Sequence, residues 1–291
     1  MRDESSCRIC GDATEAAGSK RGALTKALFR LRRCRTCGFG FVANPCEDFA
    51  DIYDESYYKG KGADPFVDYL FELEHPTATV RRLEWEGILE VVRALHPLDS
   101  SSRWLDYGCG NGGLVRHLLR SGTCQATGFE TGWIADRARA RGIPILREDD
   151  LSGDHGRYDV VTAIEVIEHL PDPLLLLRAC RRLLRPGGLL FLTTGNAAPH
   201  PDLRRWSYVY PEVHVSFFEP RTLERALTLT GFRPERRGFV PGFEKIIRFK
   251  LLKRLGFRRE RRAFDLIPWS RVARLVDARL SVSAHPIGWA A

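Results

Sequence analysis

The segment from Leu105 to Gly112, which reads LDYGCGNG, constrains the fold of this chain more than any other stretch. Apolar residues lead into it, Asp106 places a carboxylate near its start, and three glycines follow. Glycine adopts tight turns without steric cost, so the backbone here can pass close to a ligand. From Leu114 onward, apolar residues recur at helical spacing. The segment therefore predicts a buried strand that turns into a helix beside a nucleotide cofactor.

Strands and helices are expected to alternate along the region that follows. The continuous apolar run at 158–164 is typical of a strand that is buried on both faces. The alternation favours an α/β fold with a doubly wound parallel sheet, which binds ligands at the carboxyl ends of its strands. The expected strands cover 124–129, 143–146, 158–164 and 189–194, and the expected helices cover 65–95, 132–141 and 171–184.

Carboxylates stand at the expected carboxyl ends of three consecutive strands. Glu130 follows Gly110 by 20 residues, the separation at which an acidic side chain can accept both ribose hydroxyls. Asp149 comes after the third strand, where it can meet the adenine amino group. An isolated carboxylate is usually just solvated, but Asp106, Glu130 and Asp149 are expected at one edge of the sheet. We interpret the three together as cofactor contacts.

Two matching cysteine pairs stand near the start of the chain: Cys7 and Cys10, then Cys34 and Cys37, each followed by a glycine. Four thiolates at this spacing can surround one zinc ion, and they leave no coordination position open for chemistry. The alternative is a set of four unrelated thiols. We expect a structural zinc ribbon over residues 1–48.

Composition predicts a cytoplasmic protein. The polar start MRDESSCRIC lacks the apolar core of a secretory signal, and no apolar run approaches the roughly 20 residues that span a bilayer. Eight cysteines without an export signal favour thiols or metal ligands over disulfides.

The net charge of +8 is concentrated in one segment. Between 243 and 262, nine lysines or arginines stand against two glutamates and are interleaved with apolar residues. The pattern predicts an amphipathic helix. Such a helix either packs against its own domain or makes peripheral contact with an anionic membrane, and the sequence leaves both roles open.

The chain is expected to fold in four regions. The second of them carries Tyr53, Tyr57 and Tyr58, which either cover the cofactor or pack the linker. The regions are a zinc ribbon at 1–48, a connector with a helical lid at 49–98, a cofactor-binding core at 99–242 and a basic helical region at 243–291.

Four motifs stand in a fixed order: LDYGCGNG, the GFE that ends at Glu130, YDVVTAIEVIEHLPDP from Tyr158 and LLRPGGLLFLTT from Leu183. Between Arg103 and Phe239, this order resembles class I S-adenosylmethionine-dependent methyltransferases. The ribbon and the later segment PEVHVSFFEPRTLERALTLTGF resemble the branch that includes sugar and polysaccharide-biosynthesis methyltransferases. The resemblance implies a Rossmann-like sheet of seven strands, S-adenosylmethionine as cofactor, and a sugar, glycan intermediate or related small metabolite as acceptor.

The resemblance also implies where the cofactor lies. The methionine part contacts Asp106, Gly108 and Gly110, and Glu165 or Val166 borders the methyl-donor pocket. Glu130 is again expected to bind the ribose, and Asp149 is again expected to bind the adenine.

Two histidines are candidates for the catalytic base. Methyl transfer from a sulfonium is an in-line displacement, so the protein mainly aligns donor and acceptor. A hydroxyl acceptor also needs a base, and histidine is the usual one at neutral pH. His169 lies in the EHL motif at the mouth of the pocket, and His214 lies in PEVHVSF. The alternative for His214 is a loop histidine held by hydrogen bonds.

Other functions fit parts of the sequence. An RNA methyltransferase would bind phosphates through the ribbon and the basic tail, but IEVIEHL lacks the Asn-Pro-Pro-aromatic signature of base-amine methylation, so nucleic acid is not the expected partner. An NAD-dependent oxidoreductase fits the GxGxxG formed by Gly108, Gly110 and Gly113. However, Asp106 would repel an anionic dinucleotide, whereas it attracts the cationic amino group of methionine. A non-catalytic binding module stays open.

Overall fold

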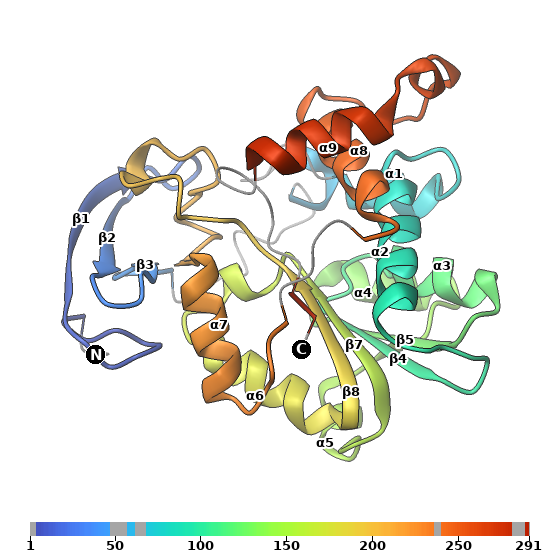
Figure 1. The fold of residues 1–291 in the computed structure, drawn as a ribbon, viewed down its shortest axis with the longest axis horizontal. Coiled ribbons are helices and arrows are strands. Elements are labelled where there is room, and N and C mark those ends of the chain that lie inside the picture. The colour runs from blue at the N-terminus through green and yellow to red at the C-terminus, as the bar shows by residue number, and fades with distance from the viewer. Residues whose placement is uncertain (1–3, 47–56, 62–67, 236–239, 281–288, 291) are drawn as a thin grey trace.

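Two sheets organise the protein (Figure 1). Its structure, a computed structural model, describes residues 4–46, 57–61, 68–235, 240–280 and 289–290. A small sheet near the N-terminus lies to one side, and a larger sheet lies between layers of helices. The larger part is the α/β fold that the alternation of apolar runs predicted.

The larger sheet has six strands among the described residues, in the order β10-β8-β7-β4-β5-β6. Its neighbouring strands are parallel, except that β10 pairs antiparallel with β8. The chain enters at β4, adds β5 and β6 on one side and then β7 and β8 on the other, so the strand order reverses beside β4. Ligands of such sheets bind at this reversal, outside the carboxyl ends of the strands. The bounds are β4 Arg103–Tyr107, β5 Gln125–Phe129, β6 Ile145–Leu146, β7 Tyr158–Ile164, β8 Leu184–Thr193 and β10 Trp289–Ala290.

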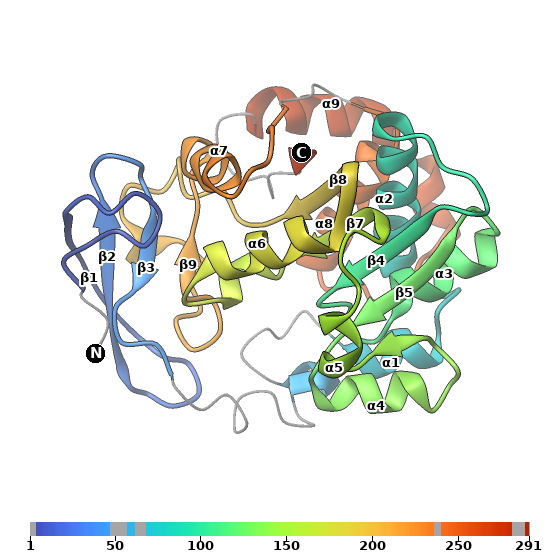
Figure 2. The same ribbon diagram turned by 90° about the horizontal axis from the view of Figure 1, so that it is seen from below.

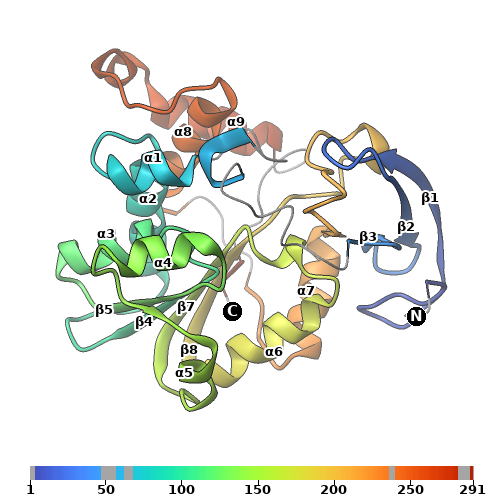
Figure 3. The same cartoon turned by 180° about the vertical axis from the view of Figure 1, so that it is seen from behind.

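Helices cover both faces of the larger sheet (Figures 2 and 3). α2, α3 and α4 lie on one face, and α6 and α7 lie on the other. The α-helices are α1 Tyr69–Glu74, α2 Arg81–Leu95, α3 Gly113–Ser121, α4 Trp133–Arg139, α5 Glu148–Ser152, α6 Pro173–Leu183, α7 Pro220–Leu229, α8 Phe243–Arg254 and α9 Trp269–Leu280. The short helical turns are η1 Tyr57–Lys61, η2 Ile167–His169, η3 Leu203–Arg205 and η4 Arg262–Leu266.

Two expectations from the sequence need correction. The helix expected over 65–95 is split, within its described part, into α1 and α2. Pro76 disfavours a helical conformation at His75, whose φ and ψ are −123° and 55°. The count of seven sheet strands is not confirmed, since the described residues contribute six.

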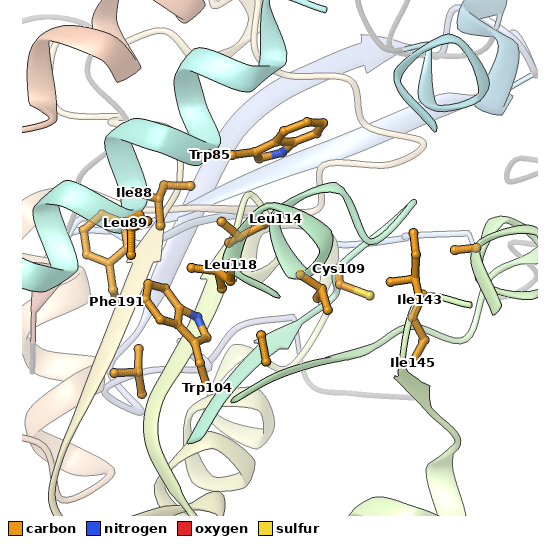
Figure 4. Packing of buried hydrophobic residues seen from close by; sticks show 14 of the residues in the cluster. Trp85, Ile88, Leu89, Trp104, Cys109, Leu114, Leu118, Ile143, Ile145 and Phe191 are labelled. Carbon is orange, nitrogen blue, oxygen red and sulfur yellow. The ribbon is translucent and has the colours of Figure 1, made fainter. Parts of the chain in front are cut away.

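Aromatic and aliphatic side chains from α2, α3 and β4 form the main core on one face of the sheet (Figure 4). Trp104 is fully buried there, and its indole Nε1 donates a hydrogen bond to Thr162 Oγ1 at 3.0 Å. A Cβ at Gly113 would lie 2.0 Å from the ring of Trp85, so α2 can approach the start of α3 only because that position is a glycine. This packing fixes the glycine-rich turn against α2.

The small sheet joins the N-terminal ribbon to a segment from the C-terminal half. Its strands are paired in the order β1-β2-β3-β9, and all three pairs are antiparallel. The last strand comes from PEVHVSFF, so the ribbon packs directly on the loop that carries His214. The bounds are β1 Thr14–Arg21, β2 Leu28–Cys34, β3 Gly40–Val42 and β9 Ser216–Phe217.

The basic segment forms α8, which packs its apolar side against α2 and α9 (Figure 1). Ile247, Phe249 and Leu252 are each at most 2% exposed, so the packing role expected as one alternative is confirmed for them. Peripheral contact with an anionic membrane stays a prediction. Among the described residues, no helix combines the length and the apolar character needed to cross a bilayer.

Candidate active site

A pocket lies at the carboxyl end of β4, where the strand order reverses. The glycine-rich turn forms one wall, and α1 and α2 form the other. This is the edge of the sheet at which the sequence predicted a cofactor. The wall residues include Tyr69, Glu72, Arg81, Asp106, Gly108 and Gly110.

The turn needs glycine at both predicted positions. Gly108 and Gly110 have φ angles of 73° and 53°, a region that other residues rarely adopt. A Cβ at Gly108 would lie 2.6 Å from Val166, and one at Gly110 would lie 2.8 Å from the ring of Tyr69. The turn therefore presents bare backbone to the pocket and to the end of β7.

Asp106 lines the pocket from the end of β4. The residue is 5% exposed, and its Oδ1 accepts a hydrogen bond from Thr162 Oγ1 at 2.8 Å. Burial raises the pKa of Asp106 to about 7, the negative charge of Glu130 adds to the rise, and the hydrogen bond opposes it. A cation bound next to Asp106 would favour its ionised form.

Glu130 links the end of β5 to the glycine-rich turn. Its Oε2 accepts from the backbone N–H of Gly110 at 3.1 Å, and its Oε1 accepts from those of Thr131 and Gly132 at 2.9 and 3.0 Å. Three backbone N–H groups therefore hold the side chain of Glu130, the residue predicted to bind the ribose.

Two tyrosines of the connector pack against Tyr69, a residue of the pocket wall. Tyr57 and Tyr58 are each 5% exposed, and both rings contact Tyr69. Tyr58 also stacks on Trp133 at a centroid distance of 5.7 Å, and burial followed by the charge of Glu130 raises its pKa. Tyr53 lies outside the described residues.

Asp149, Glu165 and also Glu130 are absent from the pocket wall. Asp149 is exposed in the first turn of α5. Glu165 follows β7 with a φ of 54°, which is rare for a residue other than glycine. Their predicted cofactor contacts stay predictions.

His169 and His214 face one another although 45 positions separate them, with ring centroids 4.8 Å apart. His169 Nδ1 lies 3.0 Å from the carbonyl oxygen of Val213, and His214 Nδ1 lies 2.7 Å from that of Tyr208. A carbonyl oxygen only accepts, so each Nδ1 carries a proton, and the neutral form of each ring has its lone pair on Nε2. The fold thus unites the two candidate bases.

The family model described as a methyltransferase domain matches residues 81–236, which is more than half of the chain. The protein belongs to this methyltransferase family. Curated relatives include the ubiquinone biosynthesis O-methyltransferases of Xanthomonas oryzae, 38% identical over 110 residues, and of Sodalis glossinidius, 39% identical over 106 residues. The alignments cover 34% and 33% of this chain and 46% and 42% of the relatives, so they span under half the relatives' length.

Solved structures support the fold of this methyltransferase. The phosphoethanolamine N-methyltransferase 2 of Haemonchus contortus, solved in complex with S-adenosyl-L-methionine, matches with a TM-score of 0.54 and 15% identity. The match covers 86% of this chain and 60% of that one. At this identity, the likeness shows the Rossmann-like fold alone.

Two charged residues that the sequence did not assign to the site form ion pairs next to it. Lys250 of α8 pairs with Glu165 at 3.2 Å and with Glu84 of α2 at 3.3 Å. Burial opposes ionisation of Glu165, but Lys250 and hydrogen bonds from Tyr208 and Thr193 outweigh it and lower the pKa. The sequence held one signal for Glu84, a charged residue on the otherwise apolar stripe of α2. In the structure this residue is only 2% exposed.

The four ribbon cysteines converge as predicted for a zinc site. Cys7 Sγ lies 3.6 Å from Cys37 Sγ, Cys10 Sγ lies 3.5 Å from Cys34 Sγ, and all four sulfurs lie within 4.8 Å of one another. Tetrahedral zinc with bonds of about 2.3 Å would place neighbouring sulfurs about 3.8 Å apart. The donor set and its spacing therefore fit a structural zinc ion.

The ribbon also holds the loop that carries His214. The fully buried carboxylate of Glu212 accepts from the backbone N–H groups of Ala23, Leu24 and Thr25 at 2.8, 2.8 and 2.7 Å. These donors form the turn between β1 and β2. A charge-assisted hydrogen bond is stronger than a neutral one, so this contact couples the ribbon to the loop that carries His214.

Proposed function

We propose that this protein transfers the methyl group of S-adenosylmethionine to an oxygen of a small hydroxylated molecule. The observation that carries the proposal is that the pocket and the histidine pair follow the carboxyl ends of two adjacent strands, β4 and β7. Membership of the methyltransferase family and the names of the curated O-methyltransferase relatives support it.

The cofactor side binds the donor through carboxylates. Asp106 attracts the cationic amino group of the methionine part, which leaves the bare backbone of Gly108 and Gly110 beside the sulfonium chain. Glu130 accepts the ribose hydroxyls, and Asp149 meets the adenine. Tyr58 and Trp133 provide an apolar cover that keeps water from the bound nucleoside.

The acceptor side receives the proton that methylation displaces. As the sulfur–methyl bond breaks, the acceptor oxygen forms the new bond to the methyl carbon, and S-adenosylhomocysteine leaves. With no cation bound at the histidine pair, His214 Nε2 takes the hydroxyl proton, and His169 lies beside it. The sugar or glycan acceptor expected from the sequence is one subclass of this chemistry.

The acceptor class is tested with methyl-labelled cofactor and three panels: polyhydroxylated aromatic compounds, nucleotide sugars and lipid-linked saccharides. We expect label on an oxygen of an aromatic compound, located by mass spectrometry. Label on a sugar would select the other subclass, and label on carbon or nitrogen would refute oxygen as the acceptor.

Thermal shifts with S-adenosylhomocysteine and with NAD test the cofactor, and a larger shift with NAD would favour an oxidoreductase.

His214→Ala tests the base. General acid–base catalysis contributes about 10²- to 10⁴-fold, so we expect turnover at saturating cofactor to fall by that order. The affinity for S-adenosylhomocysteine should stay unchanged, because His214 does not line the cofactor pocket. His155→Ala, which changes an exposed histidine, is the matched control. Full turnover in the His214 variant would remove this residue from the mechanism.

A further inference from the structure

Glu168, His169 and His214 bring three metal-ligating groups together near the carboxyl end of β7. Their ligand atoms all lie within 4.8 Å of one another. The first two belong to η2, and the third belongs to the loop that precedes β9, so only the folded chain assembles the group. Two imidazoles and one carboxylate form a donor set that suits first-row divalent metals.

Backbone carbonyls orient both imidazoles. His169 Nδ1 donates to the carbonyl of Val213, and His214 Nδ1 donates to the carbonyl of Tyr208. Each ring is thereby fixed in the tautomer whose Nε2 can bind a cation. Metal-ligating histidines almost always donate their other N–H in this way.

Hydroxyl groups hold the carboxylate of Glu168, which is fully buried. Its Oε1 accepts from the hydroxyl of Tyr208 at 2.6 Å, and its Oε2 accepts from Thr194 Oγ1 at 2.9 Å. Glu165 has Lys250 as a counterion, whereas Glu168 pairs with no lysine or arginine in the described part of the chain. A cation bound beside Glu168 would stabilise the ionised form of this buried carboxylate.

We propose that Glu168, His169 and His214 bind one first-row divalent cation of the Mn²⁺, Fe²⁺ or Co²⁺ class. The carboxylate and the two Nε2 atoms are the ligands. Glu165, with its own lysine, stays outside the set.

The consequence for catalysis rests on the proposed function. An acceptor hydroxyl that binds the cation releases its proton to solvent more readily, because a metal lowers the pKa of a bound oxygen. The oxygen lone pair then forms the bond to the methyl carbon as the sulfur–methyl bond breaks. When the cation is bound, His214 is a ligand of the cation, and the base that takes the proton is solvent.

The test titrates Mn²⁺ into zinc-replete protein and follows the free ion by electron paramagnetic resonance. We expect a single tight Mn²⁺ per chain. Glu168→Gln, His169→Ala and His214→Ala should each weaken its binding by more than roughly 10-fold. His155→Ala should bind Mn²⁺ like the wild type. Equal affinity in all four variants would overturn the proposal.

A variant outside the ligand set guards against general loss of folding. Thr194→Val keeps the three ligands and removes only one orienting hydrogen bond, so we expect Mn²⁺ affinity to fall by about 10-fold. Co²⁺ distinguishes this group from the ribbon, since imidazole and carboxylate ligands give weak visible bands without the intense near-ultraviolet band of thiolates. A Co²⁺ spectrum with the thiolate band alone would contradict the proposal.

S-adenosylhomocysteine affinity, measured on the same samples, separates this proposal from the proposed function. Cofactor binding and methyl transfer without Mn²⁺ uptake would refute the metal site and leave the function standing. Mn²⁺ uptake without any cofactor binding would refute the function and leave the metal site standing.

Discussion

The proposed cofactor side and the proposed acceptor side of this protein are built in different ways. Asp106, Gly108, Gly110 and Glu130 all belong to one unit, β4-α3-β5, and its strands bring them together. The acceptor side joins η2 to the loop before β9, and the ribbon holds that loop through Glu212. The first arrangement is local and the second depends on the whole fold. Substitutions should therefore affect one side and leave the other intact.

Loosening the ribbon should cause the largest fall in turnover and should leave the affinity for the cofactor unchanged. Cys34→Ser removes one of four thiolates, and a structural zinc site contributes folding free energy directly, so the ribbon should loosen. The donors to Glu212 would then shift, and His214 would shift with them. A displacement of about 1 Å costs roughly 100-fold in rate, which is the fall in turnover that we expect. Steady-state assays at saturating cofactor measure it.

Two variants sharpen this result. Glu212→Gln leaves the zinc ligands in place but replaces a charged acceptor, so it should reproduce part of the loss in turnover. Cys124→Ser alters a buried cysteine of the core and should retain turnover. If Cys34→Ser weakened cofactor binding as strongly as it slowed turnover, the two sides would not be separable.

Glu130→Gln should have the next largest effect, on the cofactor side. Hydrogen bonds to a charged group contribute about 1.5–3 kcal/mol, so we expect the affinity for S-adenosylhomocysteine to fall by about 10- to 100-fold. Turnover at saturating cofactor should change little, because the histidine pair is untouched. Calorimetric titration measures the affinity, and an unchanged value would remove Glu130 from the cofactor site.

The dependence of cofactor affinity on pH should be smaller. Burial and the charge of Glu130 place the pKa of Asp106 at about 7. Below this pH, Asp106 must release a proton before it can attract the cationic amino group. Affinity should therefore rise with pH, by at most about 10-fold per pH unit, and level off above pH 7. Titrations with S-adenosylhomocysteine across this range measure the slope.

Asp106→Asn is the matched control for that slope. The amide does not ionise in this range, so the variant should bind more weakly and lose most of the dependence on pH. A slope that persisted in the variant would assign the titration to another group.

The contrast between a local unit and a group assembled by the whole fold also explains what the sequence could predict. The bounds of β7 were predicted as Tyr158–Ile164 and are confirmed. A strand inside a parallel sheet is buried on both faces, so it is visible in the sequence as a continuous apolar run. Asp106, Gly108 and Gly110 were placed at the ligand edge because their spacing is local. The pocket wall contains all three.

Long-range contacts account for what the sequence missed. Lys250 reaches Glu165 from α8, a distance of 85 positions along the chain that no motif encodes. The pairing of Tyr208 with both Glu165 and Glu168 likewise depends on how the loop after β8 folds back. The helix expected over 65–95 failed for a local reason, since the effect of Pro76 on His75 was not weighed.

Parallel measurement of cofactor affinity and turnover in wild type, Glu130→Gln and His214→Ala tests the central claim most directly. We predict that S-adenosylhomocysteine binds the wild type, that Glu130→Gln lowers the affinity and spares turnover, and that His214→Ala does the reverse. A wild-type protein that takes up no S-adenosylhomocysteine, or two variants with the same pattern of loss, would contradict the account.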